Sequence, residues 1–273
     1  HLSIRRQRQM CIRDSHFDIV AGQGTLALEV FDQVPNVDTV LVPIGGGGLG
    51  SGVAGAIKLR AREEGRIVRV IGVQAANASA YLPSLEKGEA VEIRTSPTIA
   101  DGIAVSKPGA LNFAMVRDLV DEVITVTDDQ IAYSLLVLLE RAKLVVEPAG
   151  AVGVAAILSG QVNPSGNTVV LLSGGNIDPM IMERIISHGL AASERYLRLR
   201  IPLPDRPGQL ARISGIVAEA NANVVEVLHT RHNNKAQFSQ VQLELHIETR
   251  GPEHAESVLA RLREEGFDPQ VDF

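Results

Sequence analysis

Residues 37–50 read Val-Asp-Thr-Val-Leu-Val-Pro-Ile-Gly-Gly-Gly-Gly-Leu-Gly, which predicts a strand, a tight turn and the start of a helix. The first eight residues are nearly all apolar, which is typical of a strand buried on both faces of a parallel sheet. Four glycines follow, and a run rich in small residues then predicts a helix from about residue 49 to 64. The apolar stretch 67–73 predicts the next buried strand. Together these segments predict a βαβ unit.

Strands and helices continue to alternate after this unit. Strands are predicted at 123–126 and 168–172, and helices at 149–159 and at about 179–187. A further helix is expected to begin at Asp128, whose carboxylate is a suitable N-terminal cap. The alternation indicates an α/β fold built on a doubly wound open sheet.

The pattern changes near residue 191. The next strand alternates apolar and polar residues, as a strand with one solvated face does. The expected elements are a strand at 196–203, a helix at 210–220, strands at 223–232 and 237–249, a helix at 253–265 and a strand at 268–273. This β-α-β-β-α-β order is typical of a ferredoxin-like α+β domain. We therefore expect one domain at 16–190 and a second at 195–273.

The first fifteen residues, HLSIRRQRQMCIRDS, do not fit either domain. They hold four arginines and one aspartate, without an apolar segment typical of a secretory signal. We interpret 1–15 as a foreign or disordered leader, with a partner-binding basic tail as the alternative. The native protein is then expected to begin further upstream.

Composition excludes several classes of function. A single cysteine, Cys11, excludes a disulfide framework, and no Cys-rich metal site is expected. The net charge of −6 argues against a nucleic-acid partner. The longest apolar runs are much shorter than the roughly 20 residues of a membrane helix, so no membrane partner is expected. These features favour a cytoplasmic protein that handles small metabolites.

The glycines Gly45, Gly46, Gly47 and Gly48 are the strongest local signal. Exposed backbone N–H groups at the start of a helix predict a phosphate site. A nucleoside-triphosphate loop would need Gly-Lys-Ser/Thr, which is not found here. A dinucleotide loop can be fitted to Gly45, Gly47 and Gly50, but no carboxylate follows the next strand. A cofactor with one phosphate is therefore the favoured interpretation.

Two polar residues, Ser173 and Glu147, lie next to the ends of predicted elements and are candidates for a binding site. Ser173 comes directly after a strand, but residue 171 is leucine, so a hydrolase nucleophile is disfavoured. Ser173 either caps the next helix or bonds a ring nitrogen of a cofactor. Glu147 either lines a cavity or is a helix N-terminal charge beside Pro148. His229 and His232 lie three apart on a strand and make a poor metal pair.

Several motifs together resemble a known family. They are Ala-Gly-Gln-Gly-Thr at 21–25, Gly-Gly-Gly-Gly-Leu at 45–49, Ala-Asp-Gly at 100–102, Val-Glu-Pro-Ala-Gly at 146–150 and Ser-Gly-Gly-Asn at 173–176. In this order they resemble the threonine dehydratases (threonine ammonia-lyases). These are fold-type II (tryptophan synthase β-like) pyridoxal-phosphate enzymes, as are serine dehydratases and serine racemases. Residues 205–210 and 221–223 resemble an ACT domain, and the pairing is that of single-ACT threonine ammonia-lyases.

The resemblance implies particular roles. Gly45 to Gly48 and Leu49 would hold the phosphate of pyridoxal 5′-phosphate, Ser173 would face its pyridine nitrogen, and Glu147 would also belong to the cofactor site. A serine hydroxyl cannot keep the ring protonated as a carboxylate would, which suits β-elimination of L-threonine to 2-oxobutanoate and ammonia.

Two departures from the family pattern matter. The Schiff-base lysine of the family stands in a Ser-x-Lys-x-Arg context, and none of the five lysines here does. We therefore predict an N-terminally truncated catalytic domain that is inactive alone and has no catalytic residue of its own. Serine racemases carry metal-binding carboxylates where this chain has Gln74, Ala78 and Ala80, so no metal site is expected.

Alternative functions stay open on the sequence. A broader serine/threonine dehydratase or a serine racemase is close to the favoured one. A non-catalytic amino-acid sensor with a working ACT domain belongs to another class, and a dinucleotide oxidoreductase comes third. We expect an amino-acid effector near Gly208, Asn221 and Asn223. We also expect a homo-oligomer formed through both domains.

Overall fold

The computed structural model describes residues 15–230 and 240–272. Most of the predicted leader, with Cys11, and also His232 and Lys235, therefore lie outside the described residues. The chain divides into two compact units, residues 1–182 and 183–273, and α8 (Pro179–Ala192) spans the division. The sequence-based limits of 16–190 and 195–273 stay predictions.

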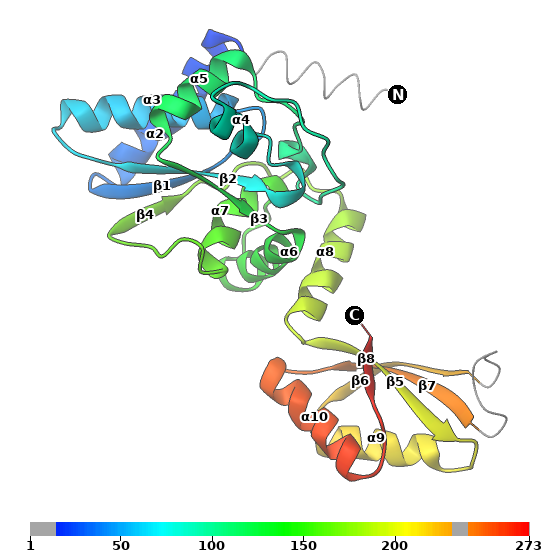
Figure 1. Cartoon of the computed structure of the whole chain (residues 1–273). Helices are drawn as coiled ribbons and strands as arrows, with labels where there is room; N and C mark the ends of the chain where they lie inside the picture. The colour runs from blue at the N-terminus through cyan, green and yellow to red at the C-terminus, as the bar shows by residue number, and fades with distance from the viewer. Residues whose placement is uncertain (1–14, 231–239, 273) are drawn as a thin grey trace. The chain divides into compact units, whose positions relative to one another are not determined.

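The first unit is an α/β domain (Figure 1). Its elements are α2 (Phe17–Gln33), β1 (Val37–Pro43), α3 (Gly48–Glu63), β2 (Arg69–Ala75), η1 (Ala76–Ala78), α4 (Tyr81–Lys87), η2 (Asp101–Ile103), α5 (Ala110–Leu119), β3 (Glu122–Val126), α6 (Asp128–Val137), the π-helical η3 (Leu138–Ala142), α7 (Pro148–Leu158) and β4 (Asn167–Val170). The four strands form a parallel sheet in the order β3-β2-β1-β4. The predicted open parallel sheet is confirmed.

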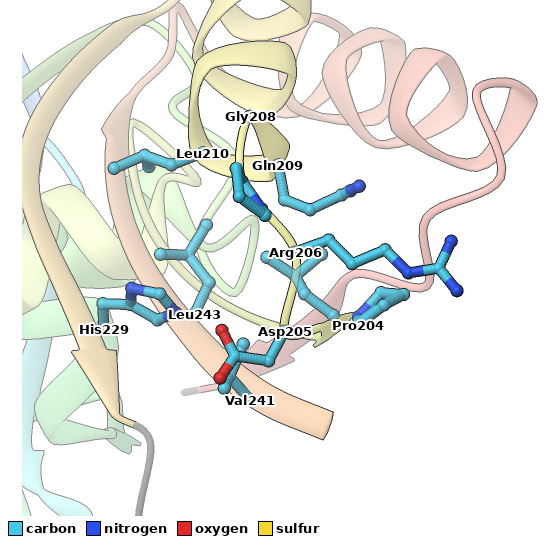
Figure 2. A pocket seen from close by; sticks show the side chains of 11 residues that line it. Pro204, Asp205, Arg206, Gly208, Gln209, Leu210, His229, Val241 and Leu243 are labelled. Carbon is cyan, nitrogen blue, oxygen red and sulfur yellow. The ribbon is translucent and has the colours of Figure 1, made fainter. Parts of the chain in front are cut away.

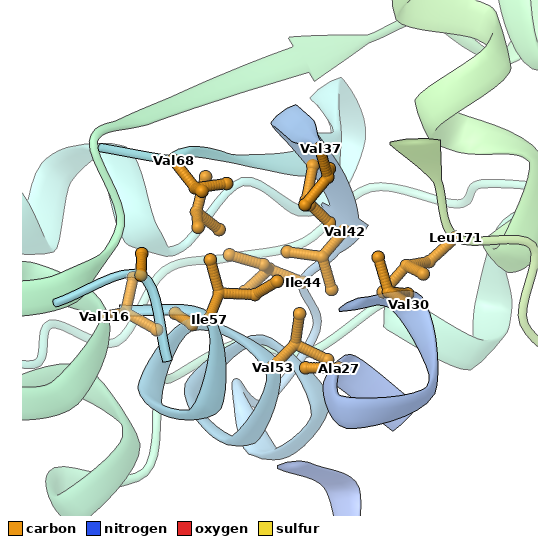
Figure 3. Close-up of a cluster of buried hydrophobic side chains, with 14 of the residues drawn as sticks. Ala27, Val30, Val37, Val42, Ile44, Val53, Ile57, Val68, Val116 and Leu171 are labelled. Atoms are coloured by element: carbon orange, nitrogen blue, oxygen red, sulfur yellow. The ribbon is translucent and has the colours of Figure 1, made fainter. Parts of the chain in front are cut away.

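Helices cover both faces of this sheet because both faces of its central strand are apolar. Val42 of β1 belongs to a core cluster with Val53 and Ile57 of α3, which Figure 3 shows in close-up. The alternate residue, Leu41, faces the opposite side, where Gly153 lets α7 approach to van der Waals distance. Small residues also bring helices together, since a Cβ on Gly52 of α3 would lie 2.2 Å from the carbonyl oxygen of Val20 in α2.

The order of the strands creates a topological switch point between β1 and β4. The chain passes from β1 to β2 and β3 on one side, and then returns to pair β4 with the other side of β1. In open α/β sheets the ligand lies beyond the carboxyl ends of the strands at such a point. The glycines after β1 and the serine after β4 flank it.

Two sequence-based details are wrong at the ends of elements. Strand β2 begins at Arg69, and Ile67, predicted inside the strand, is 93% exposed. Helix α6 is capped by Thr127, not by Asp128, in a capping box with Gln130. The two candidates were adjacent, and the carboxylate of Asp128 instead accepts hydrogen bonds from the Thr98 hydroxyl (2.6 Å) and the Ile99 N–H (3.2 Å).

The capping box gives a first prediction. Thr127→Ala removes the hydroxyl that accepts from the Gln130 N–H (3.3 Å), and we expect it to lower the free energy of unfolding by about 1 kcal/mol. Urea unfolding followed by circular dichroism measures this loss. The control is Thr25→Ala within α2, whose exposed hydroxyl donates to the Gly22 carbonyl of its own helix. An equal loss in both variants would contradict the assignment.

The second unit has the predicted ferredoxin-like order. Its elements are β5 (Tyr196–Pro204), α9 (Gln209–Glu219), β6 (Asn223–Thr230), β7 (Gln240–Glu248), α10 (Pro252–Glu264) and β8 (Gln270–Asp272). The antiparallel sheet has the order β6-β7-β5-β8, and its alternating apolar residues, such as Leu199 and Leu245, pack under α9 and α10. Strand β6 is an edge strand that exposes Val225, Val227 and Leu228.

The described residues also bear on membrane and metal binding. Across 15–230 and 240–272, no helix has the length and apolar character needed to cross a membrane. The same residues bring no three histidine, cysteine or acidic side chains together in a way that could hold a metal ion.

Candidate functional site

The candidate site lies at the carboxyl edge of the parallel sheet. Leu41 of β1 is in register with Val170 of β4, so the segments that follow the two strands leave the sheet side by side. The glycines Gly45–Gly48 follow β1, and Ser173 follows β4. The structure thus brings the two strongest sequence signals to the switch point.

The glycine loop has the geometry of an anion site. Gly47 is the N-cap of α3, with φ of 98°, and Gly48 is the first helical residue. The N–H groups of the first turn have no acceptor within a helix, and they carry the positive end of the helix dipole. Gly45, Gly46 and Leu49 are half-exposed, which leaves the loop accessible.

Two buried side chains hold the glycine loop by hydrogen bonds to its Gly46 carbonyl. The carbonyl oxygen of Gly46 accepts hydrogen bonds from the Tyr81 hydroxyl (3.2 Å), Asn112 Nδ2 (3.0 Å) and the Gly109 N–H (3.4 Å). Burial raises the pKa of Tyr81 well above its usual range, so its hydroxyl keeps the proton that it donates. Buried Gln74 donates to the Ile44 carbonyl (3.2 Å) and accepts from the Tyr81 N–H (3.0 Å). Sequence reasoning missed the roles of Tyr81 and Asn112.

The segment that contains Ser173 is pressed against the start of α7. A Cβ on Gly150 would lie 1.9 Å from the Ser173 carbonyl oxygen, so only glycine fits there. Ser173 does not cap the next helix, because Asp178 does so: its carboxylate accepts from the Met180 N–H at 2.8 Å. The helix-cap interpretation of Ser173 is therefore wrong, and a bond from its hydroxyl to a cofactor ring nitrogen stays a prediction.

Glu147 is half-buried at the N-terminus of α7, beside the Ser173 segment. Its N–H donates to the Gly174 carbonyl (3.1 Å), and its carboxylate accepts from the Asn176 N–H. Burial, together with the nearby charge of Asp101, raises the pKa of Glu147 above 4.5. Glu147 is thus a helix N-terminal charge, as one of the two interpretations has it, and its place in a cofactor cavity stays a prediction.

The raised pKa predicts a pH dependence. The folded state binds the Glu147 proton more tightly than the unfolded chain does. This difference stabilises the folded state at low pH, and the stabilisation is lost as the pH rises through the folded-state pKa. We expect Glu147→Gln, which stays neutral, to gain stability relative to wild type as the pH rises from about 4.5. Melting curves at a series of pH values measure the difference. Glu86→Gln, at an exposed site on α4, is the control. A pH-independent difference for Glu147→Gln would contradict the assignment.

The lysines with described positions lie away from Ser173 or on the surface. Lys58 bonds to Asp121 (2.6 Å) and to the Val68 carbonyl (2.8 Å), at the amino edge of the sheet. Lys143 bonds to the Glu140 carbonyl of its own π-helical turn (2.8 Å), and Lys87 ends α4. Lys107 is exposed, two residues before Gly109.

A separate cavity lies in the second unit, at the start of α9. It has a volume of about 300 Å³ and is lined by residues 203–210, His229, Val241 and Leu243. Figure 2 shows Asp205, from the loop before α9, and His229, from β6, among the side chains that line it. Gly208, with φ of 90°, is the N-cap of α9 and lines the cavity.

Asn221 and Asn223 do not line this cavity. They follow the far end of α9, an eleven-residue helix about 16 Å long. Within one chain, the structure therefore does not bring them together with Gly208.

Two family models match this chain, one for each of its two units. The pyridoxal-phosphate dependent enzymes match residues 4–174, and an ACT domain matches residues 198–267. The chain belongs to the pyridoxal-phosphate dependent enzymes of fold type II and carries an ACT domain, as the sequence motifs indicate. The family match begins inside the predicted leader 1–15, whose foreign origin stays a prediction.

Two curated relatives that match most of the chain are both L-threonine ammonia-lyases. It is 46% identical over 250 residues to the L-threonine ammonia-lyase of Geobacter sulfurreducens, covering 91% of this chain and 61% of that protein. It is 44% identical over 254 residues to the L-threonine ammonia-lyase of Thermotoga maritima, covering 93% and 62%. The crystal structure of a threonine deaminase from T.th. aligns with a TM-score of 0.54 and 37% identity, covering 58% of each chain. The chain thus spans about three fifths of the length of the curated relatives that it matches.

Proposed function

We propose that this chain is part of a pyridoxal-phosphate-dependent threonine ammonia-lyase, which converts L-threonine to 2-oxobutanoate and ammonia. The observation that carries the proposal is the convergence of the glycine loop and Ser173 at the switch point. The two L-threonine ammonia-lyases that match more than nine tenths of the chain support the choice of substrate.

The residues present fit this cofactor. The loop Gly45–Gly48, with Leu49, offers backbone N–H groups at a helix N-terminus to a phosphate, and Gly45, Gly46 and Leu49 are half-exposed. Ser173 would present a hydroxyl to the pyridine nitrogen, and a hydroxyl leaves that nitrogen less protonated than a carboxylate would. Glu147 holds the backbone of the Ser173 segment through Gly174. When bound, pyridoxal phosphate supplies the electron sink for loss of the substrate α-proton and hydroxyl.

The reaction and its alternatives can be separated with a chimera. The part of the Geobacter sulfurreducens relative that this chain does not match would be joined to it, to supply a lysine segment. We expect the folded chimera to release 2-oxobutanoate from L-threonine faster than pyruvate from L-serine. Faster serine turnover would favour a broader dehydratase, and D-serine formation a racemase. A folded chimera that binds the cofactor without turnover would favour the amino-acid sensor and contradict the proposal.

We further propose that the cavity at Gly208 binds an amino-acid effector. The α9 N-terminus suits a carboxylate, Asp205 suits an ammonium group, and Leu203 and Leu243 suit an aliphatic side chain. Asn221 and Asn223 would join this site only across two copies of the chain.

Calorimetry with L-isoleucine, L-valine, L-threonine and L-serine tests the effector site. We expect saturable heat from at least one of them, and its loss in Gly208→Val, because a β-branched residue is strained at φ of 90°. Gly215→Ala, inside α9 with open space around it, is the control. Absence of heat from all four amino acids would count against the site.

The remaining expectations concern assembly and location. We propose that the exposed edge strand β6 pairs with a second copy, and that the catalytic unit contributes to the same homo-oligomer. We also propose domain limits of 16–190 and 195–273 and a cytoplasmic location. Sedimentation velocity on the chain and on a β6 variant with Val225→Lys tests the pairing.

A further inference from the structure

The carbonyl oxygen of Gly46, in the glycine loop, accepts three hydrogen bonds. Its three donors come from α4, from α5 and from the residue before α5. Two of them, Tyr81 and Asn112, are fully buried, so their donor groups have little access to water as an alternative acceptor. The carbonyl is therefore fixed toward α4 and α5.

Fixing this carbonyl also fixes the next N–H group. In a trans peptide the C=O of Gly46 and the N–H of Gly47 point in opposite directions, and the described residues contain no cis peptide. The N–H of Gly47 consequently points away from α4 and α5. Gly47 takes the left-handed conformation that this turn needs, and a Cβ there would lie 1.9 Å from the Tyr81 oxygen. Tyr81 thus packs directly on Gly47 while it bonds to Gly46.

The donors are themselves held in place. The N–H of Tyr81 donates to Gln74, which in turn donates to the Ile44 carbonyl just before the loop. The Tyr81 ring packs beside Phe113, with 6.4 Å between ring centroids. This series of hydrogen bonds, which runs from β2 to α4 and back to the glycine loop, leaves the Tyr81 hydroxyl little freedom.

We propose that Tyr81 and Asn112 are positioning residues that orient the Gly46–Gly47 peptide, so that the Gly47 N–H is presented to the cofactor phosphate. This inference rests on the proposed cofactor site. A preorganised donor binds more tightly than one that must be ordered on binding. The two side chains therefore set the affinity for the phosphate without touching it.

Calorimetry on the 273-residue chain tests this role with two ligands. Pyridoxine 5′-phosphate and pyridoxine share a ring, lack the aldehyde that reacts with lysines, and differ in the phosphate. Tyr81→Phe keeps the ring and removes the donor, and we expect the Kd for pyridoxine 5′-phosphate to rise about fivefold to tenfold. The Kd for pyridoxine should not change. Asn112→Leu should act in the same direction, and Tyr133→Phe, at a 40% exposed tyrosine on α6, should change neither Kd.

The outcomes separate this inference from the proposed function. A wild-type chain without preference for the phosphorylated ligand overturns both. A preference that persists unchanged in Tyr81→Phe and Asn112→Leu overturns the positioning role alone. Melting curves verify that each variant is folded, and if Asn112→Leu is not, the Tyr81→Phe ratio decides.

Discussion

The purified 273-residue chain, supplied with pyridoxal phosphate and L-threonine, is expected to release 2-oxobutanoate no faster than free cofactor does. The reason is chemical, because the reaction needs a lysine amine at the cofactor as covalent partner and base. Lys58 and Lys143 are held by hydrogen bonds elsewhere, and no lysine has the family context. A coupled assay for 2-oxobutanoate measures the rate.

Turnover by the chain would contradict this account directly. One of the five lysines would then serve as the base, and Lys107 would be examined first, because it lies two residues from a contact of the glycine loop. Lys87→Ala, at the exposed end of α4, is the matched control for a Lys107→Ala variant.

The second large effect is expected from Gly150→Ala. The new methyl group would lie 1.9 Å from the carbonyl oxygen and 2.9 Å from the nitrogen of Ser173, so backbone, not a flexible side chain, must move. We expect the free energy of unfolding to fall by about 2–3 kcal/mol. The affinity for pyridoxine 5′-phosphate should fall as well, because Ser173 is displaced. Urea unfolding and calorimetry measure the two effects.

A glycine elsewhere in the same unit provides the control. At Gly55, inside α3, a Cβ would meet only the Met115 methyl group, at 3.5 Å. Gly55→Ala is therefore expected to raise the free energy of unfolding by about 0.5–1 kcal/mol, since alanine is the better helix former. An equal change in the free energy of unfolding for Gly150→Ala and Gly55→Ala would show that the close approach of the Ser173 segment to α7 does not depend on a glycine at position 150.

The sequence predicts those parts of the fold and site that depend on short stretches of chain. The apolar run of β1 and the glycines after it define a strand, a turn and a helix N-terminus within residues 37–50. The position of Ser173 near the carboxyl end of a strand is predicted in the same way, because it directly follows the predicted strand 168–172. The C-terminal pattern of alternating residues likewise predicts the order of the ACT domain, which is confirmed.

The contacts that hold the loop could not be predicted in this way. Tyr81 and Asn112 reach Gly46 from 35 and 66 residues away, and neither lies in a recognisable motif. Thr127 and Asp128 are both good caps, so only the competing bond of Asp128 to Thr98 separates them. Asn221 follows Gly208 closely in sequence, but the intervening helix α9 carries it to the opposite end.

Amide NMR can show whether the backbone N–H groups of the loop Gly45–Gly48 bind the phosphate of the cofactor. The chain, labelled with ¹⁵N and ²H, would be titrated with pyridoxine 5′-phosphate and, in a second sample, with pyridoxine. We expect phosphate-dependent shifts of the amides from Gly46 to Leu49, with ring-dependent shifts at Ser173. Phosphate-dependent shifts confined to other parts of the chain, with these amides unchanged, would contradict it.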